Sequence, residues 1–154
     1  MAHYYCDSSA VVKRYVIEVG TGWMNRLCAV SAGHTIYTVR ISGAEVVAAL
    51  FLRSRMGTLA APDAYAAAQQ FRADFQNRYQ ILEVTQTLVD MAMALAEKHN
   101  LRGYDAVQLA AALSINQVRA SLSLSPVTFV CADNRLNTAA ATENLQFENP
   151  NMHP

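Results

Sequence analysis

Short runs of apolar and β-branched residues alternate along the chain with longer stretches of helical periodicity. The strand-like runs cover residues 3–6, 35–39, 81–84, 127–131 and 145–148. Residues 127–131 are apolar almost without interruption, which is typical of a strand buried on both faces. In the stretches between the runs, apolar residues recur every three to four positions, as in helices that bury one face.

Local signals predict where several helices begin. Ser8 or Ser9 is placed to cap a helix over residues 10–17. Ser42 and Glu45 fit an S-x-x-E capping box ahead of a helix that reaches residue 56. Further helices are expected over residues 23–30, 62–79 and 87–100, from residue 103 onward, and in a short stretch from residue 134.

The alternation of strands and helices predicts an α/β fold. We expect a three-layer α/β/α sandwich whose central parallel sheet has about five short strands. The 154 residues have the length of one ordinary domain, and 53% hydrophobic residues are enough to form a core. No repeat, low-complexity tract or linker interrupts the pattern, so residues 1–154 are expected to form a single domain.

Charge and cysteine content narrow the class of protein. Lys and Arg total 12, as do Asp and Glu, so the formal net charge is zero. This balance argues against a protein that coats nucleic acid generally, but it allows an enzyme that holds nucleic acid through metal ions and a few arginines. Three cysteines without C-x-x-C spacing indicate reduced thiols. Since neither a signal peptide nor an apolar run long enough for a bilayer is present, we expect a cytoplasmic protein without a membrane partner.

Four carboxylates are placed to converge in such a fold. Asp7 directly follows the first strand, and Asp133 follows the strand at residues 127–131 after one small residue. Because ligands of parallel sheets bind at the carboxyl ends of the strands, both side chains are expected at the same edge. Glu45 and Asp105 lie at predicted helix starts that pack beside this edge.

Crowded carboxylates repel one another and raise each other's pKa, and a divalent cation removes that penalty. Mg²⁺ and Mn²⁺ prefer oxygen ligands, and a site that holds them can bind a phosphate and activate a water molecule. Each acid also has a purely structural interpretation. Asp7, Asp105 and Asp133 could serve as helix N-caps, and the capping box alone would explain Glu45.

Four segments resemble, in order, the motifs of the PIN-domain family, in particular the VapC-like toxins of bacterial toxin–antitoxin pairs. Together they extend over nearly the whole chain. They read YCDSSAVVKRYV at residues 5–16, SGAEVVAAL at 42–50, LRGYDAVQLAAA at 101–112 and FVCADNRL at 129–136.

The resemblance implies an α/β/α sandwich, RNA cleavage that depends on Mg²⁺ or Mn²⁺, a homodimer, and an antitoxin partner whose tail blocks the active site. Carried over by motif, the residues that bind metal and orient the attacking water are Asp7, Glu45, Asp105 and Asp133. Ser8 or Ser9 would support the site through a hydroxyl. Cys131 stands where a Thr or Ser often precedes the fourth acid, and a thiol is a weaker hydrogen-bond donor.

A few other side chains are candidates for contact with RNA. Arg14 and Arg102 lie next to the motifs and are expected to contact phosphates. Trp23 and Tyr104 are able to stack on a base, but buried packing is the favoured interpretation of both.

Two other functions compete with the nuclease. One is a catalytically idle PIN-like scaffold that binds RNA or protein, and the presence of all four acids counts against it. The other is a receiver-type phosphoacceptor domain, which pairs two acids after its first strand and uses a late lysine. Here Ser8 and Ser9 follow Asp7, and the only lysines are Lys13 and Lys98.

Overall fold

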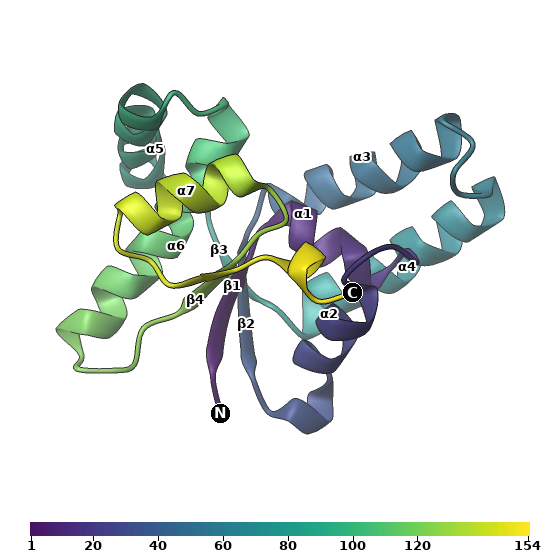
Figure 1. Ribbon diagram of the computed structural model, residues 1–154, viewed down its shortest axis with the longest axis horizontal. Helices are drawn as coiled ribbons and strands as arrows, with labels where there is room; N and C mark the ends of the chain where they lie inside the picture. Colours follow the sequence, from purple (N-terminus) through teal and green to yellow (C-terminus); the bar gives the residue numbers. More distant parts are fainter.

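A single parallel sheet organises the computed structural model, which describes residues 1–154 (Figure 1). Its five strands lie in the order β3-β2-β1-β4-β5, and every neighbouring pair is parallel. The strands are β1 (His3–Cys6), β2 (Thr35–Val39), β3 (Gln80–Leu82), β4 (Thr128–Val130) and β5 (Phe147–Glu148). This order differs from the 2-1-3-4-5 order of receiver domains, so the structure excludes that rival.

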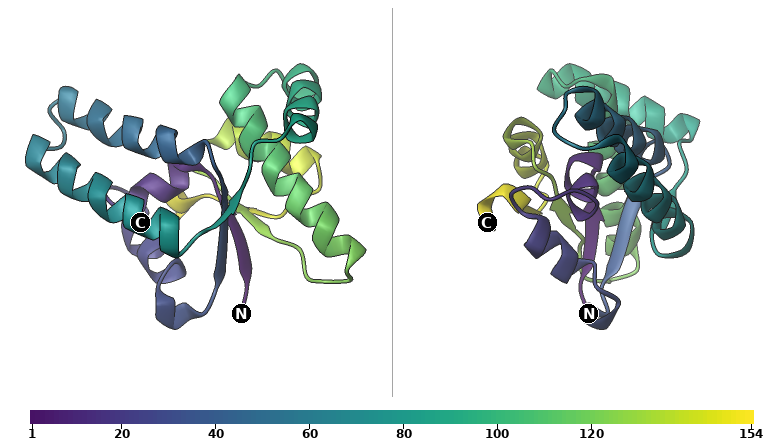
Figure 2. Two further views of the ribbon diagram at one scale, coloured as in Figure 1. Left: turned by 180° about the vertical axis from the view of Figure 1, so that it is seen from behind. Right: turned by 90° about the vertical axis from the view of Figure 1, so that its right-hand side faces the viewer.

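Helices cover both faces of the sheet, which confirms the predicted three-layer sandwich (Figure 2). One face carries α1 (Ser8–Val11), α2 (Thr21–Leu27), α3 (Ser42–Arg55) and α4 (Ala61–Asn77). The other face carries α5 (Gln86–His99), α6 (Gly103–Ser121) and α7 (Asn134–Thr142). Three short 3₁₀ turns, η1 (Val12–Arg14), η2 (Val30–Ala32) and η3 (Pro150–Met152), complete the fold. No helix combines the length and the apolar character that crossing a membrane would require.

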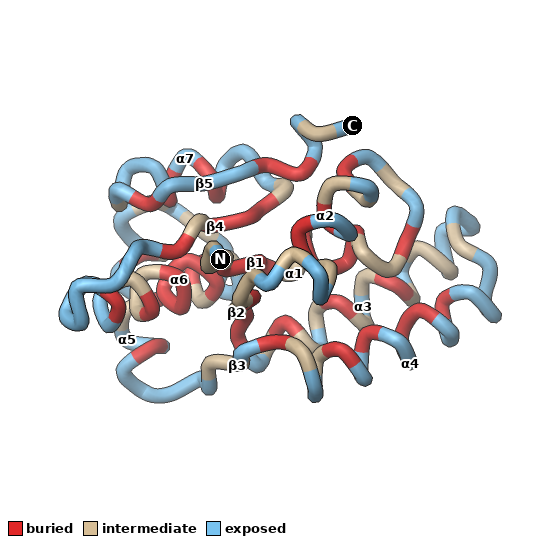
Figure 3. Tube along the Cα trace, turned by 90° about the horizontal axis from the view of Figure 1, so that it is seen from below, coloured by how far each residue is buried: buried red, intermediate tan, exposed pale blue.

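Alternation along the central strands divides the core into two apolar clusters. Tyr5 and Phe129 face α5, α6 and α7, and their rings stack with centroids 5.8 Å apart. Cys6 and Val130 face the other way, toward α1 to α4. Full burial of a side chain such as Phe129 contributes roughly 1.5–3 kcal/mol. Buried positions follow the sheet and the inner sides of the helices, while the connection between α3 and α4 is exposed (Figure 3).

The first helix differs from the sequence prediction in its length and in its cap. Residues 10–17 were expected to be helical, but α1 ends at Val11 and continues only as η1. Asp7, rather than Ser8 or Ser9, caps α1 by accepting the backbone N–H of Ala10. This cap is one of the structural roles that the sequence left open for Asp7.

The capping box predicted at the start of α3 does not form. Ser42 is the first helical residue, and no side chain caps the helix. The Ser42 hydroxyl instead accepts hydrogen bonds from Thr38 and Gln108. Glu45 is thereby left free of the backbone, and its carboxylate turns toward α1 and α6.

Candidate active site

Asp7 and Asp133 lie at the carboxyl edge of two adjacent strands. The backbone N–H of Asp7 donates to the carbonyl of Val130, 3.1 Å away, which joins the ends of β1 and β4. Oδ1 of Asp7 accepts from Ser9 Oγ at 2.6 Å and from the Ala10 N–H at 3.0 Å. Asp133 caps α7, because its Oδ1 accepts the N–H groups of the next helical residues. The structural role that the sequence allowed for Asp133, a helix N-cap, is thus also present in the structure.

Glu45 and Asp105 come from the first turns of α3 and α6. Glu45 Oε2 accepts from Ser8 Oγ at 3.2 Å, and Oε1 accepts from Gln108 Nε2 at 2.7 Å. Asp105 does not cap α6, since that position belongs to Arg102, and no hydrogen bond holds its carboxylate.

Electrostatic coupling links the four acids into one cluster, the carboxylate cluster of Asp7, Glu45, Asp105 and Asp133. Burial raises the pKa of Asp7 to about 6, although hydrogen bonds from Ser9, Cys131 and Ala10 oppose the rise, and the charge of Asp105 adds to it. Burial also raises the pKa of Glu45, to which Asp7 and Asp105 contribute further. The pKa of Asp105 is raised by burial and by Asp133. Asp105 therefore couples to each of the other three acids, while the charges of Arg102 and Arg135 offset part of the rise in its pKa.

The donor set fits a hard divalent cation, because all four groups offer carboxylate oxygens. One of them, Asp105, has no hydrogen-bond partner and is half-buried next to like charges. No three His, Cys, Asp or Glu side chains lie together in an arrangement that would hold a metal ion as they stand. Binding a cation therefore requires the carboxylates to close around it.

Two cavities flank the carboxylate cluster and meet at Arg102. The larger, about 710 Å³, is lined by Ser8, Ser9 and Glu45 on one side. The smaller, about 220 Å³, is lined by Asp105 and Asp133 together with arginine side chains. A substrate that enters either cavity reaches the carboxylates directly.

The two arginines named from the sequence have different environments. Arg14 is nearly buried, with 9% of its side chain exposed; it pairs with Asp74 at 3.3 Å and donates to the Tyr79 hydroxyl at 2.6 Å. Arg102 is exposed, lines both cavities and has no hydrogen bond or ion pair. Of these two arginines, only Arg102 is therefore available to a substrate beside the carboxylates.

Ser9 and Cys131 connect the loops that carry Asp7 and Asp133. Ser9 Oγ accepts the Ala132 N–H at 2.9 Å and lies 3.7 Å from the Cys131 thiol. The thiol accepts the Asp133 N–H at 3.3 Å. Cys131 thus supports Asp133 as an acceptor, and its thiol also donates to the Asp133 carbonyl oxygen at 3.7 Å.

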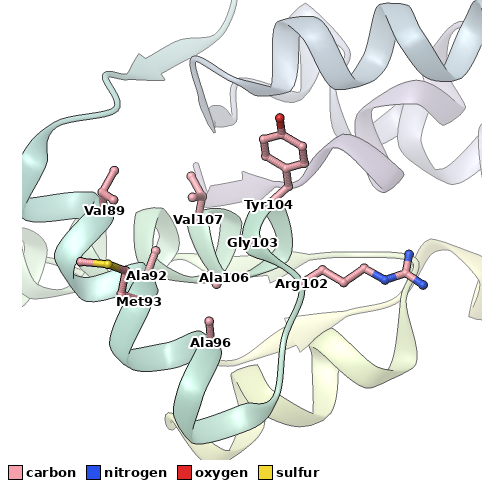
Figure 4. Close-up of a pocket in the computed structure, with 9 residues that line it drawn as sticks. All are labelled: Val89, Ala92, Met93, Ala96, Arg102, Gly103, Tyr104, Ala106 and Val107. Atoms are coloured by element: carbon pink, nitrogen blue, oxygen red, sulfur yellow. The ribbon is translucent and has the colours of Figure 1, made fainter.

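At the start of α6, the side chains of Arg102 and Tyr104 point in different directions (Figure 4). Tyr104 was expected to be buried, but it is 62% exposed and borders the larger cavity. Beside it lies an apolar pocket of about 370 Å³ between α5 and α6, to which Val89 and Met93 contribute. Trp23 is partly buried and stacks on His153 with ring centroids 4.4 Å apart, in accord with a packing role.

Gln108 is the residue near the carboxylates that sequence reasoning missed. It lies three positions after Asp105 on α6, and this spacing places both side chains on one helix face. A polar residue at that position of an otherwise apolar helix segment was the available signal.

Comparison with solved structures assigns the fold. No protein-family model matches the sequence, and a search of curated proteins found no match. VapBC2 from Rickettsia felis, bound to a DNA fragment from its promoter, aligns with a TM-score of 0.61 and 15% identity over 96% of this chain and 98% of that one. FitAcB from Neisseria gonorrhoeae aligns with a TM-score of 0.61 and 13% identity, over 96% and 97% of the two chains.

A third structure is VapC20 from Mycobacterium tuberculosis, described as a toxin that cleaves the sarcin–ricin loop. It aligns with a TM-score of 0.58 and 18% identity, over 88% of this chain and 94% of that one. The chain therefore has a PIN-domain fold. Within that fold class, the solved structures that it resembles include VapC-type toxins, as the sequence motifs predicted.

Proposed function

We propose that this chain is an Mg²⁺- or Mn²⁺-dependent endoribonuclease that acts as the toxin of a type II toxin–antitoxin pair. The carboxylate cluster carries the proposal, because at the carboxyl edge of a PIN-type sheet Asp105 couples electrostatically to each of the other three acids. The likeness to a toxin described as cleaving the sarcin–ricin loop supports RNA as the substrate.

The cation would be held by Asp7, Glu45, Asp105 and Asp133. When bound, it would neutralise phosphate charge and lower the pKa of a coordinated water molecule. The backbone and hydroxyl donors around Asp7 and Asp133 all use Oδ1, so Oδ2 of each remains available as a ligand. Ser8 orients Glu45 and Ser9 orients Asp7, which limits the rotation of both carboxylates before a cation arrives.

Substrate contacts are proposed at the meeting point of the two cavities. Arg102 has a free guanidinium and would bind a phosphate next to the scissile bond. The exposed ring of Tyr104 would stack on a base. Arg14 is not proposed to contact RNA, because Asp74 and Tyr79 already bind its guanidinium.

The partners proposed from the motifs are an antitoxin and a second copy of the chain, in the cytoplasm. VapBC2, a structural neighbour, is bound to promoter DNA, which supports a place in a toxin–antitoxin system. The apolar pocket between α5 and α6 offers one surface for such a contact (Figure 4).

A catalytically idle PIN-like scaffold is the second candidate, and one observation favours it. No three potential ligands are already arranged to hold a metal ion. An idle scaffold would bind RNA through Arg102 but would leave it intact.

An RNA-cleavage assay separates the two candidates. Purified protein is incubated with end-labelled RNA in Mn²⁺, in Mg²⁺ and in EDTA, beside Asp105→Asn and the matched surface variant Asp90→Asn on α5. We expect cleavage that requires the cation and falls at least about 100-fold in Asp105→Asn, while Asp90→Asn matches the parent. Intact RNA with the parent in every cation would establish the idle scaffold instead.

A further inference from the structure

Gln108 is an amide buried where α6 meets the sheet and α3, with 1% of its surface exposed. A buried side-chain amide lowers stability unless its donors and acceptor are satisfied. Here all of them are used, and the partners come from β1 and α3.

The three hydrogen bonds of Gln108 define one orientation of its amide. Oε1 accepts the Tyr5 hydroxyl at 2.7 Å. Nε2 donates to Ser42 Oγ at 2.9 Å and to Glu45 Oε1 at 2.7 Å. A rotated amide would point its carbonyl oxygen at the Glu45 carboxylate, which is repulsive, and would lose two donors.

The two hydrogen bonds that Nε2 donates are also the only ones between α6 and α3. The two helices bring Asp105 and Glu45 to the site, and these like charges repel each other. A neutral amide that donates to Glu45 holds the first turn of α3 close to α6 without adding charge.

The two carboxylates of these helices are held very differently. Glu45 is restrained at both oxygens, by Gln108 and by Ser8, whereas Asp105 has no hydrogen bond. The cluster must close around a cation, and closure costs less conformational entropy when one ligand is already fixed.

We propose that Gln108 is a positioning residue, which holds the Glu45 carboxylate at the place where it joins Asp105 in binding a divalent cation. The inference rests on the proposed metal-dependent function and adds a determinant of cation affinity outside the four acids. Gln108 itself contacts neither cation nor substrate.

The test is a calorimetric titration of Mn²⁺ into the full chain and into Gln108→Met, which keeps an unbranched side chain of similar length but has no amide. We expect the dissociation constant for Mn²⁺ to rise roughly 10- to 100-fold, as for other residues that orient metal ligands. Gln117→Met is the matched control, because Gln117 is an exposed glutamine on the same helix and should bind Mn²⁺ like the parent.

Tyr5→Phe provides a second variant in case Gln108→Met does not fold. It keeps the buried ring and removes only the hydroxyl that sets the amide's orientation. We expect a smaller rise, roughly threefold to tenfold, in the same dissociation constant. Thermal unfolding of each variant shows whether the fold is intact.

The outcomes separate this inference from the function on which it rests. If the parent binds Mn²⁺ and Gln108→Met binds it equally well, the positioning role is wrong and the metal centre is retained. If Gln108→Met is unfolded, the same conclusion is drawn from Tyr5→Phe. A lower melting temperature with unchanged Mn²⁺ affinity has the same meaning, because it shows a purely structural role. A parent that fails to bind Mn²⁺ at all overturns the metal centre and the positioning role together.

Discussion

Two polar clusters of this molecule both contain carboxylates, but the carboxylates have different partners. One is the carboxylate cluster, in which anions face one another. The other, which we call the Arg14 cluster, lies where η1 packs against the C-terminal end of α4. It consists of Arg14, Tyr15, Asp74, Arg78 and Tyr79.

In the Arg14 cluster each charged group has a partner of opposite sign within the protein. Asp74 pairs with Arg14 at 3.3 Å and with Arg78 at 3.4 Å, and it accepts the Tyr15 hydroxyl at 2.8 Å. In the carboxylate cluster, by contrast, Asp7, Glu45 and Asp105 all have raised pKa values. We call the Arg14 cluster closed, because its charged groups pair with one another, and the carboxylate cluster open, because its carboxylates do not. A closed charge network contributes to stability, whereas an open one retains its capacity to bind a ligand.

Breaking the closed network should have the largest effect on stability. We expect Asp74→Ala to lower the free energy of unfolding by roughly 3–5 kcal/mol, because it leaves the buried Arg14 without its partner. Denaturant unfolding measures the change. Asp63→Ala, at the exposed start of the same helix, should cost less than about 1 kcal/mol. Equal losses in the two variants would show that the Arg14 cluster does not depend on its ion pair.

Removing one charge from the open cluster should act in opposite directions on activity and stability. Asp7→Asn is expected to reduce RNA cleavage at least about 100-fold while keeping the fold, because asparagine also caps helices well. It should also stabilise the cation-free protein at pH 7 by up to roughly 3 kcal/mol, since the buried charge is gone. Cleavage equal to that of the parent would show that Asp7 is not a ligand.

The pH dependence of the Asp7 contribution follows from the direction of its pKa shift. Its pKa is raised from 3.8 to about 6 in the folded protein, so the native state binds more protons than the unfolded state between these values. The parent in EDTA should therefore become more stable as the pH falls from about 7 toward 4. This gain should be smaller in Asp7→Asn, and thermal unfolding across that range measures the difference.

The smallest predicted effect concerns Arg102, whose guanidinium has no ion-pair partner and lies beside the carboxylate cluster. Arg102→Ala should weaken RNA binding and reduce the slope of log affinity against log salt by about 0.7, the value for one phosphate contact on a single strand. Arg72→Ala, an exposed arginine on α4 outside both cavities, serves as the control. Filter binding between 50 and 200 mM salt, all in the cleavage-deficient Asp105→Asn background, measures the slopes. An unchanged slope would remove Arg102 from the RNA contact.

Much of the fold was predictable because it follows local periodicity. The apolar runs predicted all five strands, and the β–α alternation predicted a parallel sheet, which in turn placed Asp7 and Asp133 at one edge. Helix ends were predicted less well, since competing partners decide them. Glu45 does not form the expected capping box, because its carboxylate accepts hydrogen bonds from Ser8 and Gln108, which are both far away in sequence.

By itself, the sequence determined the order of the elements, the layered architecture and the four acids whose types suit a divalent cation. Only the tertiary structure decided which neighbouring charges are balanced: it buried Arg14 against Asp74, left Arg102 free and joined Gln108 to Glu45. The physical reason is that periodicity acts over a few residues, whereas hydrogen bonds and ion pairs form between side chains that packing brings together from 60 or more positions apart.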